Sequence, residues 1–308
     1  MLAGAGMKSL AATALALAGL AQAQTPPASA LSTPAPALQQ ACSAVPQQPF
    51  DGRGLALRSQ CVLMGLVASA HPVAEARELA RKSLALGEPA GGFMLYLVFN
   101  NDPENTYLRA GKPDLDLYRK LGRRGLAQRA EQVEAIDGLA FAAGKGHANA
   151  GILLARLFHE TVAPRNVARL SALVDLLNKR GEHSPELERF GRQAEAVGRA
   201  APATKASVRA FFDAYRTGVA TAIAGYGVQT GGKSCGEASL KSATAGDIAG
   251  AEYLPLKSVL AEGSFLVRGE WPEFWTFTAC GEDVPVKITF VADGWGRATF
   301  TAIHNKGA

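Results

Sequence analysis

The residues of this chain with the clearest chemical meaning are its four cysteines, Cys42, Cys61, Cys235 and Cys280. An even number of cysteines is typical of disulfides in a protein that leaves the cytoplasm. We expect the pairing that keeps each bond within its own region, Cys42–Cys61 and Cys235–Cys280. A zinc site is the alternative, but the sequence has no C-x-x-C pair and no histidine close to a cysteine. A redox or nucleophilic role for the two Cys-Gly-Glu sequences is a further alternative.

Carboxylates and histidines are the next candidates for chemistry. Glu270, Glu273, Asp283 and Asp293 crowd one C-terminal stretch, and two of them could face each other as the acid/base pair of a hydrolase. Turn and edge positions are the interpretation that we favour for all four. The five histidines have no metal-ligand spacing on a helix face, and no G-x-S-x-G, Walker or Rossmann pattern is present. We therefore expect no catalytic residue, no metal and no cofactor.

The chain has three tryptophans, Trp271, Trp275 and Trp295, all in this same stretch. Exposed indoles bind sugar rings or partner side chains. Trp295 lies between two glycines, which predicts a turn and partial exposure. The alternative places Trp275 in the core and Trp271 over an edge. We therefore take the three as candidate contacts to a ligand or partner.

Residues 1–23 have the three regions of a secretion signal. Lys8 precedes the uncharged apolar run 10–20, and Ala-Gln-Ala at 21–23 is a small-x-small cleavage pattern. A transmembrane helix is the alternative, but the run is shorter than the roughly 20 apolar residues that spanning needs. The sequence predicts a mature protein without membrane insertion, located in the periplasm or secreted. The start codon, Met1 or Met7, stays open.

The net charge of +5 is unevenly distributed. Residues 24–50 are uncharged and residues 201–308 are balanced, so the basic surplus falls on residues 51–200. The surplus is small for so long a segment and predicts a mildly basic surface without a polyanion-binding stripe. Together with export, it argues against nucleic acid as a partner.

The elements that would position these residues follow from proline content and periodicity. Residues 24–50 are rich in proline, alanine and glutamine and predict an extended or disordered linker. Apolar residues at helical spacing then make residues 51–200 a helical domain. A further helix begins the C-terminal domain and should end near Gly225 and Gly227. The expected helices cover residues 73–86, 90–100, 133–145, 148–159, 167–180 (capped by Asn166) and 203–224.

Short glycine turns join these helices in pairs. Residues 84–90 and 142–150 share small residues around Gly87 and Gly146, and Gly181 marks a weaker third copy. Ala-Ala-x-Lys-Gly-His-Ala-x-Ala followed by an apolar helix resembles the turn of Sel-type repeats, the α/α relatives of tetratricopeptide repeats. The resemblance implies stacked helix pairs in which glycine adopts a left-handed cap. Residues 101–131 would hold a degenerate or inserted unit. An irregular helical bundle is the alternative.

The sequence predicts that residues 201–308 form a small α+β domain. Apolar and polar residues alternate with a period of two, which predicts an antiparallel meander with strands at 273–280, 284–291 and 297–303. Leu266 and Val267 should add a strand. The pattern W-x-x-x-W-x-F-x-x-C-G at 271–281 is similar to C-terminal domains of uncharacterised exported bacterial proteins. That resemblance implies no activity.

The predicted fold is mainly α, with α/α helical repeats at 51–200 followed by the small α+β domain at 201–308. Stacked helix pairs form a concave groove that suits peptides or protein surfaces. The sequence therefore favours an exported protein–protein interaction protein, an adaptor that is not an enzyme. The first alternative is a module that binds cell-wall glycan through its tryptophans. The second is a hydrolase that uses carboxylates of the C-terminal domain.

Overall fold

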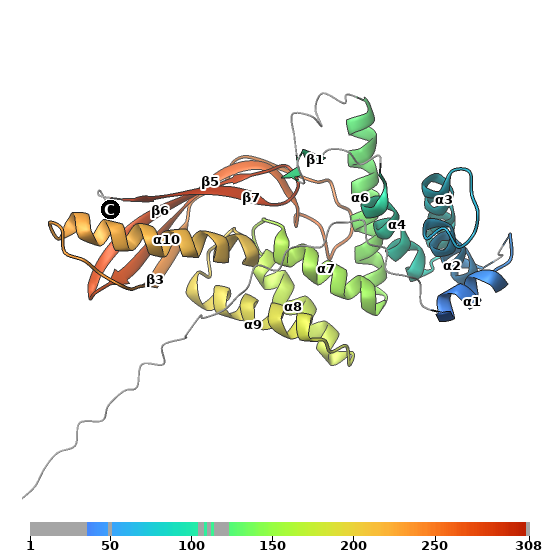
Figure 1. Ribbon diagram of the computed structural model, residues 1–308, viewed down its shortest axis with the longest axis horizontal. Coiled ribbons are helices and arrows are strands. Elements are labelled where there is room, and N and C mark those ends of the chain that lie inside the picture. The colour runs from blue at the N-terminus through green and yellow to red at the C-terminus, as the bar shows by residue number, and fades with distance from the viewer. Residues whose placement is uncertain (1–35, 49–50, 104–107, 110–111, 114–122, 306–308) are drawn as a thin grey trace, which may run out of the picture. The chain divides into compact units, whose positions relative to one another are not determined.

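The computed structural model describes residues 36–48, 51–103, 108–109, 112–113 and 123–305. The predicted signal peptide and residues 24–35 of the predicted linker lie outside the described residues. Within the described part, a helical region precedes an antiparallel sheet, which confirms the predicted fold class in its coarse form (Figure 1). The helices are α1 (Pro36–Ala44), α2 (Gly52–Leu63), α3 (Pro72–Ala85), α4 (Pro89–Asn101), α6 (Arg123–Gly144), α7 (Ala148–Glu160), α8 (Asn166–Lys179), α9 (Pro185–Ala200) and α10 (Val208–Gln229).

The strands fall into two sheets. β1 (Leu108–Arg109) and β2 (Lys112–Pro113) pair with each other. The larger sheet contains β3 (Ala238–Ala245), β4 (Ala249–Tyr253), β5 (Leu266–Ala279), β6 (Glu282–Ala292) and β7 (Ala298–His304). Among the described residues, no helix is both long and apolar enough to cross a membrane.

The linker prediction is wrong for residues 36–44, which form α1. Cys42 on α1 is bonded to Cys61 on α2, with the two Cα atoms 5.5 Å apart, and both residues are buried. We call this bond the α1–α2 disulfide. Pro36 occupies the first helical position, which tolerates proline, and the alanines and glutamines that follow are good helix formers. The helix was not predicted because the prolines on either side of it made the whole segment resemble an extended linker.

The second disulfide joins Cys235 and Cys280, whose Cα atoms lie 5.9 Å apart. It ties the segment after α10 to the tip of the β5–β6 hairpin, and we call it the hairpin disulfide. Cys280 is exposed and has a φ of 47°, in the left-handed region. Both disulfides therefore have the predicted pairing.

The three predicted glycine turns share one backbone geometry. Gly87, Gly146 and Gly181 have φ values of 79°, 90° and 81°. In each turn the residue after the glycine donates to a carbonyl five residues back, as in Glu88 N to Ser83 O at 3.2 Å. This is the Schellman pattern, which satisfies the last carbonyls of the first helix and reverses the chain. The turns therefore join α3 to α4, α6 to α7 and α8 to α9 in equivalent ways.

Glycines in the second helices allow neighbouring pairs to approach closely. A Cβ on Gly92 of α4 would lie 2.3 Å from the carbonyl oxygen of Gly138 on α6. A Cβ on Gly151 of α7 would lie 2.5 Å from Leu177 on α8. Both glycines follow their turn glycine by the same number of residues, and both contact the first helix of the next pair. This equivalence is what stacked helix pairs require.

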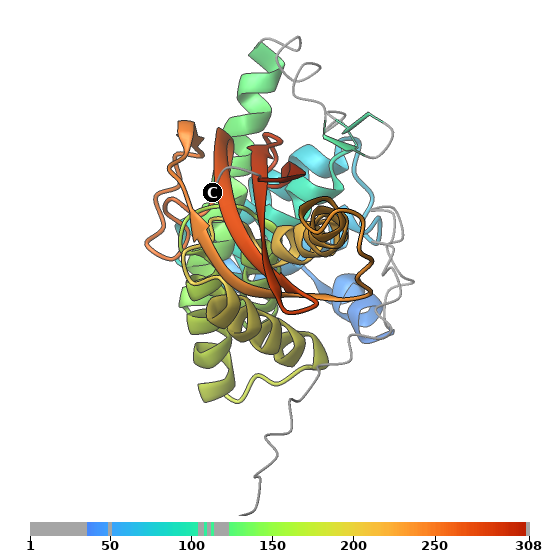
Figure 2. The same ribbon diagram turned by 90° about the vertical axis from the view of Figure 1, so that its left-hand side faces the viewer.

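The larger sheet packs one face against α10. Its strand order is β3-β5-β6-β7, and β4 also pairs with β5. Figure 2 shows α10 end-on against the curved sheet. Alternate residues of β5 and β6 point toward the helix, so Trp275, Phe277 and Val286 are buried. A Cβ on Gly218 of α10 would lie 2.8 Å from Phe277, so the missing side chain lets the sheet approach.

Several sequence expectations for this region need correction. Leu266 and Val267 belong to β5 itself and do not form a separate strand. The predicted meander is therefore present with a longer first strand, and β3 and β4 were missed. Every residue of β4 is exposed, and β3 consists largely of alanine, serine and threonine with one lysine. β3 does alternate apolar and polar residues, but most of its apolar residues are alanines and a bulge between Leu240 and Ser242 breaks the period, whereas β4 has no such alternation.

Helix boundaries also differ from prediction: α6 begins at Arg123, ten residues before the expected helix at 133–145, and α8 and α10 differ as well. α10 begins at Val208, with Ser207 as its cap, and continues through Gly225 to Gln229. Gly225 does not end the helix: a Cβ there would lie 2.9 Å from the ring of His304, so glycine makes room for β7. Asn166 is the first residue of α8 rather than its cap. Its buried amide donates to the carbonyls of Thr161 and Ser264.

The apolar core does not divide at the predicted boundary near residue 200. One core runs from Ile136 on α6 through the later helices to Ala292 on β6. A second, smaller core joins α2, α3 and α4, from Ala56 to Val98. Phe93 on α4 packs against both. The two cores therefore meet where α4 packs on α6. This point precedes the α8–α9 pair in the chain and lies well before the predicted boundary near residue 200.

Candidate functional site

The candidate functional site is a groove between α3 and α6, at the meeting of the two cores. It has a volume of about 950 Å³. Both walls are the first helices of glycine-turn pairs, and Lys257, from the segment after β4, also lines the groove. The groove is lined by Arg81, Leu84, Ala85, Gly87, Ala127, Ala130, Glu131, Val133, Glu134, Asp137, Gly138, Phe141 and Lys257.

Two ion pairs join the walls of the groove. Arg81 donates from Nε and Nη2 to the two carboxylate oxygens of Glu134, at 2.7 and 2.6 Å. One turn earlier on each helix, Arg77 donates to Glu131 at 3.0 Å. A two-point guanidinium–carboxylate contact fixes orientation as well as distance. The pairs therefore set the spacing of α3 and α6. Arg81 neutralises Glu134, whereas Arg77 is shared between Glu131 and Asp102, to which it donates at 2.7 Å.

The third carboxylate of the groove has a structural role of its own. Asp137 Oδ1 accepts from the backbone N–H groups of Lys257 and Ser258, each at 2.9 Å. These bonds hold the segment after β4 against α6. A Cβ on Gly144 would touch Leu260 at 3.5 Å, so the same segment also lies close to the end of α6. The C-terminal part of the chain thus contributes to a groove built by the first helices.

The surface that remains open in the groove is mostly apolar. Leu84, Val133 and Phe141 contribute large side chains, and alanines on both helices keep the space between them open. Clustered exposed apolar side chains mark surfaces that bind partners. Because its carboxylates are already held, the groove offers hydrophobic contact in place of acid/base chemistry.

Trp271 and Trp275 are not surface contacts, so the prediction of a ligand or partner role for them is wrong. They are 0% and 1% exposed. Their Nε1 atoms both donate to the carboxylate of Glu273, at 3.1 and 3.0 Å. Both indoles point inward because they lie on the face of β5 that meets α10. A period of two predicted their shared face but gave no sign of which face is covered.

Trp295 is half-buried in the turn between β6 and β7. The guanidinium of Arg129 on α6 lies 4.9 Å from its ring centroid and also donates to the carbonyl of Gly294. Asp293 shapes the turn by accepting from the backbone N–H groups of Trp295 and Arg297. The indole therefore takes part in an internal contact with α6, and its partial exposure agrees with the expectation.

The four candidate carboxylates have separate roles. Glu273 is fully buried and also accepts from Thr204 Oγ1 and Lys205 N. Asp283 pairs with Lys241, and Glu270 is exposed on the other face of β5. In the strand register, neither glutamate lies opposite another of the four carboxylates. The arrangement gives no support to an acid/base pair among them.

The two histidines beside the helix pairs have structural partners. His147 caps α7 by accepting from Ala150 N, and its ring stacks on Phe93 at 4.7 Å. His159 bonds to Gln193 and stacks on Phe190 at 4.4 Å. Burial lowers the pKa of both imidazoles. Among the described residues, no three His, Cys, Asp or Glu side chains are placed to hold a metal ion.

A smaller cavity of about 490 Å³ lies where the end of α10 meets β5, β6 and β7. His304 lines it, and its Nε2 is buried with no hydrogen-bond partner. The other lining residues are Val228, Gln229, Thr276, Asp283, Pro285 and Asn305.

Sequence reasoning missed the groove, because the residues that pair across it are 53 and 54 positions apart in the chain. Residues 101–131 were assigned to a degenerate unit, whereas α6 begins at Arg123. Arginines at 77 and 81, and glutamates at 131 and 134, are one helical turn apart on their helices. That charge spacing was the available signal.

Comparison with known proteins gives no assignment: no protein-family model, no curated protein and no solved structure matches this chain.

Proposed function

We propose that this protein is an exported binding protein that holds an apolar segment of a partner protein in the groove between α3 and α6. The observation that supports the proposal most is that the charged and the apolar residues of the groove have different roles. Its carboxylates are held by arginines or by backbone N–H groups, while its apolar side chains face open space. An amphipathic helix or apolar peptide complements such a surface.

The equivalent turns and stacking glycines support a repeat-like origin for the groove. In stacked helix pairs, the first helices of successive units lie side by side and present a continuous surface. Here α3 and α6 face each other across the groove, joined by the Arg81–Glu134 and Arg77–Glu131 pairs, and α4 packs against both helices. Membership of the Sel-type family is part of the proposal and rests on the turn sequence at 142–150 and on the shared turn geometry.

Export to the periplasm or beyond belongs to the same proposal. Disulfides persist in oxidising compartments and are rare in the cytosol. The two disulfides of this chain are compatible with that location. The glycan-binding alternative has lost its main support, since two of the three tryptophans are buried.

Site-specific photo-crosslinking in the bacterial envelope tests the proposal. Ala130 is exposed on the groove face of α6, and Ala220 is exposed on α10, outside the groove lining. A photoreactive amino acid at position 130 should give a discrete protein adduct on irradiation, and the same group at position 220 should not. Equal adducts from both positions, or none from either, would contradict binding in the groove.

A further inference from the structure

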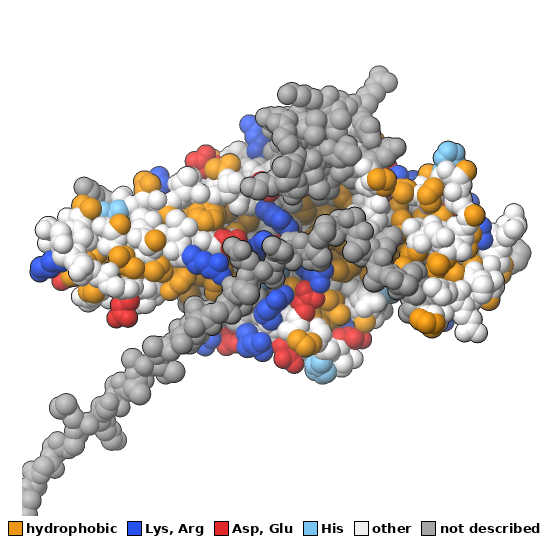
Figure 3. All heavy atoms as spheres, in the orientation of Figure 1, with side chains coloured by type: hydrophobic (Ala, Val, Ile, Leu, Met, Phe, Trp, Pro, Cys, Tyr) orange, Lys and Arg blue, Asp and Glu red, His pale blue; other side chains and the backbone are white. Residues whose placement is uncertain are grey.

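A second surface, on the face formed by α7, α9 and α10, carries a concentration of arginines. Figure 3 shows blue side chains over this part of the molecule, with red ones between them. Four arginines from four elements form this cluster: Arg156 from α7, Arg189 from α9, Arg209 from α10 and Arg297 from the β6–β7 turn. Their side chains are between 41 and 49% exposed, so each guanidinium is open to solvent. None of the four lines either cavity described above.

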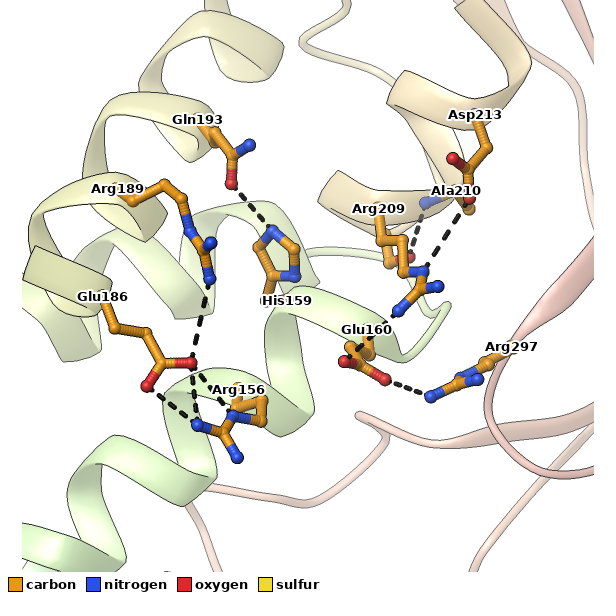
Figure 4. Close-up of polar contacts among 11 residues, drawn as sticks. Arg156, His159, Glu160, Glu186, Arg189, Gln193, Arg209, Ala210, Asp213 and Arg297 are labelled. Carbon is orange, nitrogen blue, oxygen red and sulfur yellow. Dashed lines mark hydrogen bonds and ion pairs between the residues drawn. The ribbon is translucent and has the colours of Figure 1, made fainter. Parts of the chain in front are cut away.

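Two glutamates form ion pairs with these four arginines. Glu186 binds Arg156 at 2.8 Å and Arg189 at 3.9 Å. Glu160 binds Arg209 at 3.6 Å and also binds Arg297. Figure 4 shows each carboxylate between its two guanidinium groups. Since each carboxylate is shared, the cluster keeps a positive surplus that the glutamates do not neutralise.

The remaining neighbours do not remove this surplus. Asp213 is the additional acid, 3.9 Å from Arg209. His159 sits between the two halves of the cluster, and burial lowers its pKa, so it is neutral at pH 7. A guanidinium has five N–H donors in a rigid fork that matches a carboxylate. Arg156 already engages Glu186 through both Nε and Nη2, and Arg209 contacts Glu160 and Asp213 through separate nitrogens. Arg189 and Arg297 each contact their shared glutamate through a single nitrogen, so most of their N–H donors are left for a ligand.

We propose that this arginine cluster is a docking surface for an acidic segment of a partner protein. The argument is charge complementarity: four half-exposed guanidiniums share too few acids, and free forks favour carboxylate groups. The cluster crosses three helices and a turn without lining a cavity, which suits an extended chain with several carboxylates. The proposal does not depend on the groove.

The most direct test removes Glu160, a carboxylate of the protein itself that competes with an acidic ligand for the arginines. Glu160→Gln takes the carboxylate away from Arg209 and Arg297, which leaves Arg297 open to a ligand and Arg209 with Asp213 as its acidic neighbour. The probe is a fluorescein-labelled decaglutamate peptide, with binding to the full-length mature protein followed by anisotropy. We expect Glu160→Gln to tighten binding about threefold or more at low ionic strength, because a paired acid no longer competes. Salt at about 0.15 M should weaken binding to every variant.

Glu195→Gln is the matched control, because Glu195 pairs with Arg199 on the exposed side of α9 and the charge change is the same. It should leave the affinity close to that of the unchanged protein. Arg209→Gln with Arg297→Gln should weaken binding about tenfold. Circular dichroism of each variant checks that it is folded, and Arg156→Gln with Arg189→Gln replaces the first pair if it is not.

Three outcomes would overturn the proposal. The first is no peptide binding by the unchanged protein or by Glu160→Gln. The second is an equal gain from Glu160→Gln and Glu195→Gln, which would show a general charge effect. The third is binding of a sulfated oligosaccharide at this cluster while decaglutamate does not bind, which would assign the surface to an anionic glycan.

Discussion

The buried carboxylate of Glu273 should be a major determinant of stability, and its replacement gives a quantitative prediction. The side chain is 0% exposed and accepts hydrogen bonds from two indoles, one hydroxyl and one backbone N–H. In Glu273→Gln, one carboxylate oxygen becomes an amide nitrogen, which cannot accept. At least one buried donor then loses its acceptor, and the remaining bonds lose their charge assistance.

The hydrogen-bond geometry identifies which donor should lose its acceptor in Glu273→Gln. Oε1 accepts from Thr204, Lys205 and Trp271, whereas Oε2 accepts from Thr204 and from Trp275. The amide should therefore place its nitrogen at the Oε2 position, where Trp275 Nε1 is left without an acceptor. An unsatisfied buried donor costs about 1–3 kcal/mol, and charge-assisted bonds are about twice as strong as neutral ones. We expect Glu273→Gln to lower the free energy of unfolding by about 3 kcal/mol.

Urea unfolding at pH 7, followed by tryptophan fluorescence, measures this change, since two of the reporter indoles contact Glu273. Glu270→Gln, on the exposed face of the same strand, should change stability by less than about 0.5 kcal/mol. Trp275→Phe removes the orphaned donor, so it should cost less in the Glu273→Gln background than alone. A Glu273→Gln protein within about 0.5 kcal/mol of the unchanged protein would refute the reasoning.

Three further predictions follow from the turns, disulfides and histidines. Gly146→Val should cost about 1–3 kcal/mol, because a β-branched residue is strained at a φ of 90°, whereas Gly198→Val, on an open helix face, should cost less than about 1 kcal/mol in urea unfolding. Mild reductant should open the exposed hairpin disulfide before the buried α1–α2 disulfide, measured by alkylation and mass spectrometry. Burial lowers the pKa of His159 from 6.5, so its neutral form favours the folded state above that pH, and stability should fall as pH drops below it. His159→Gln should reduce the loss between about pH 7.5 and 5.5.

The helices were predictable where periodicity and turn chemistry agreed. The stripes of α7 and α8 and the turns at Gly87, Gly146 and Gly181 all lie where the sequence indicated them. These features are local, because the left-handed glycine of each turn and the small residues that begin the next helix lie within about ten residues of one another. The disulfide pairing was also predictable, because each partner lies within its own region of the chain.

The rest depends on contacts between distant segments. The groove needs Arg81 and Glu134 to meet, and the carboxylate of Glu273 is held by Thr204 from before α10. No spacing rule connects such pairs. The burial of Trp271 and Trp275 depends on which face of β5 meets α10, and alternation alone leaves the two faces equivalent. The edge strand β4 carries no apolar pattern, since no face of it is buried.

The affinity of the groove for its crosslinked partner is the most direct test of the central claim. Ala130→Arg places a long charged side chain in the apolar groove, and Ala220→Arg makes the same change on an exposed face of α10. Once the partner captured at position 130 has been purified, isothermal titration calorimetry gives its Kd for each variant. We expect Ala130→Arg to weaken binding at least about tenfold, equal to about 1.4 kcal/mol, with Ala220→Arg unchanged. An unchanged Kd for Ala130→Arg would contradict the assignment of the groove as the binding site.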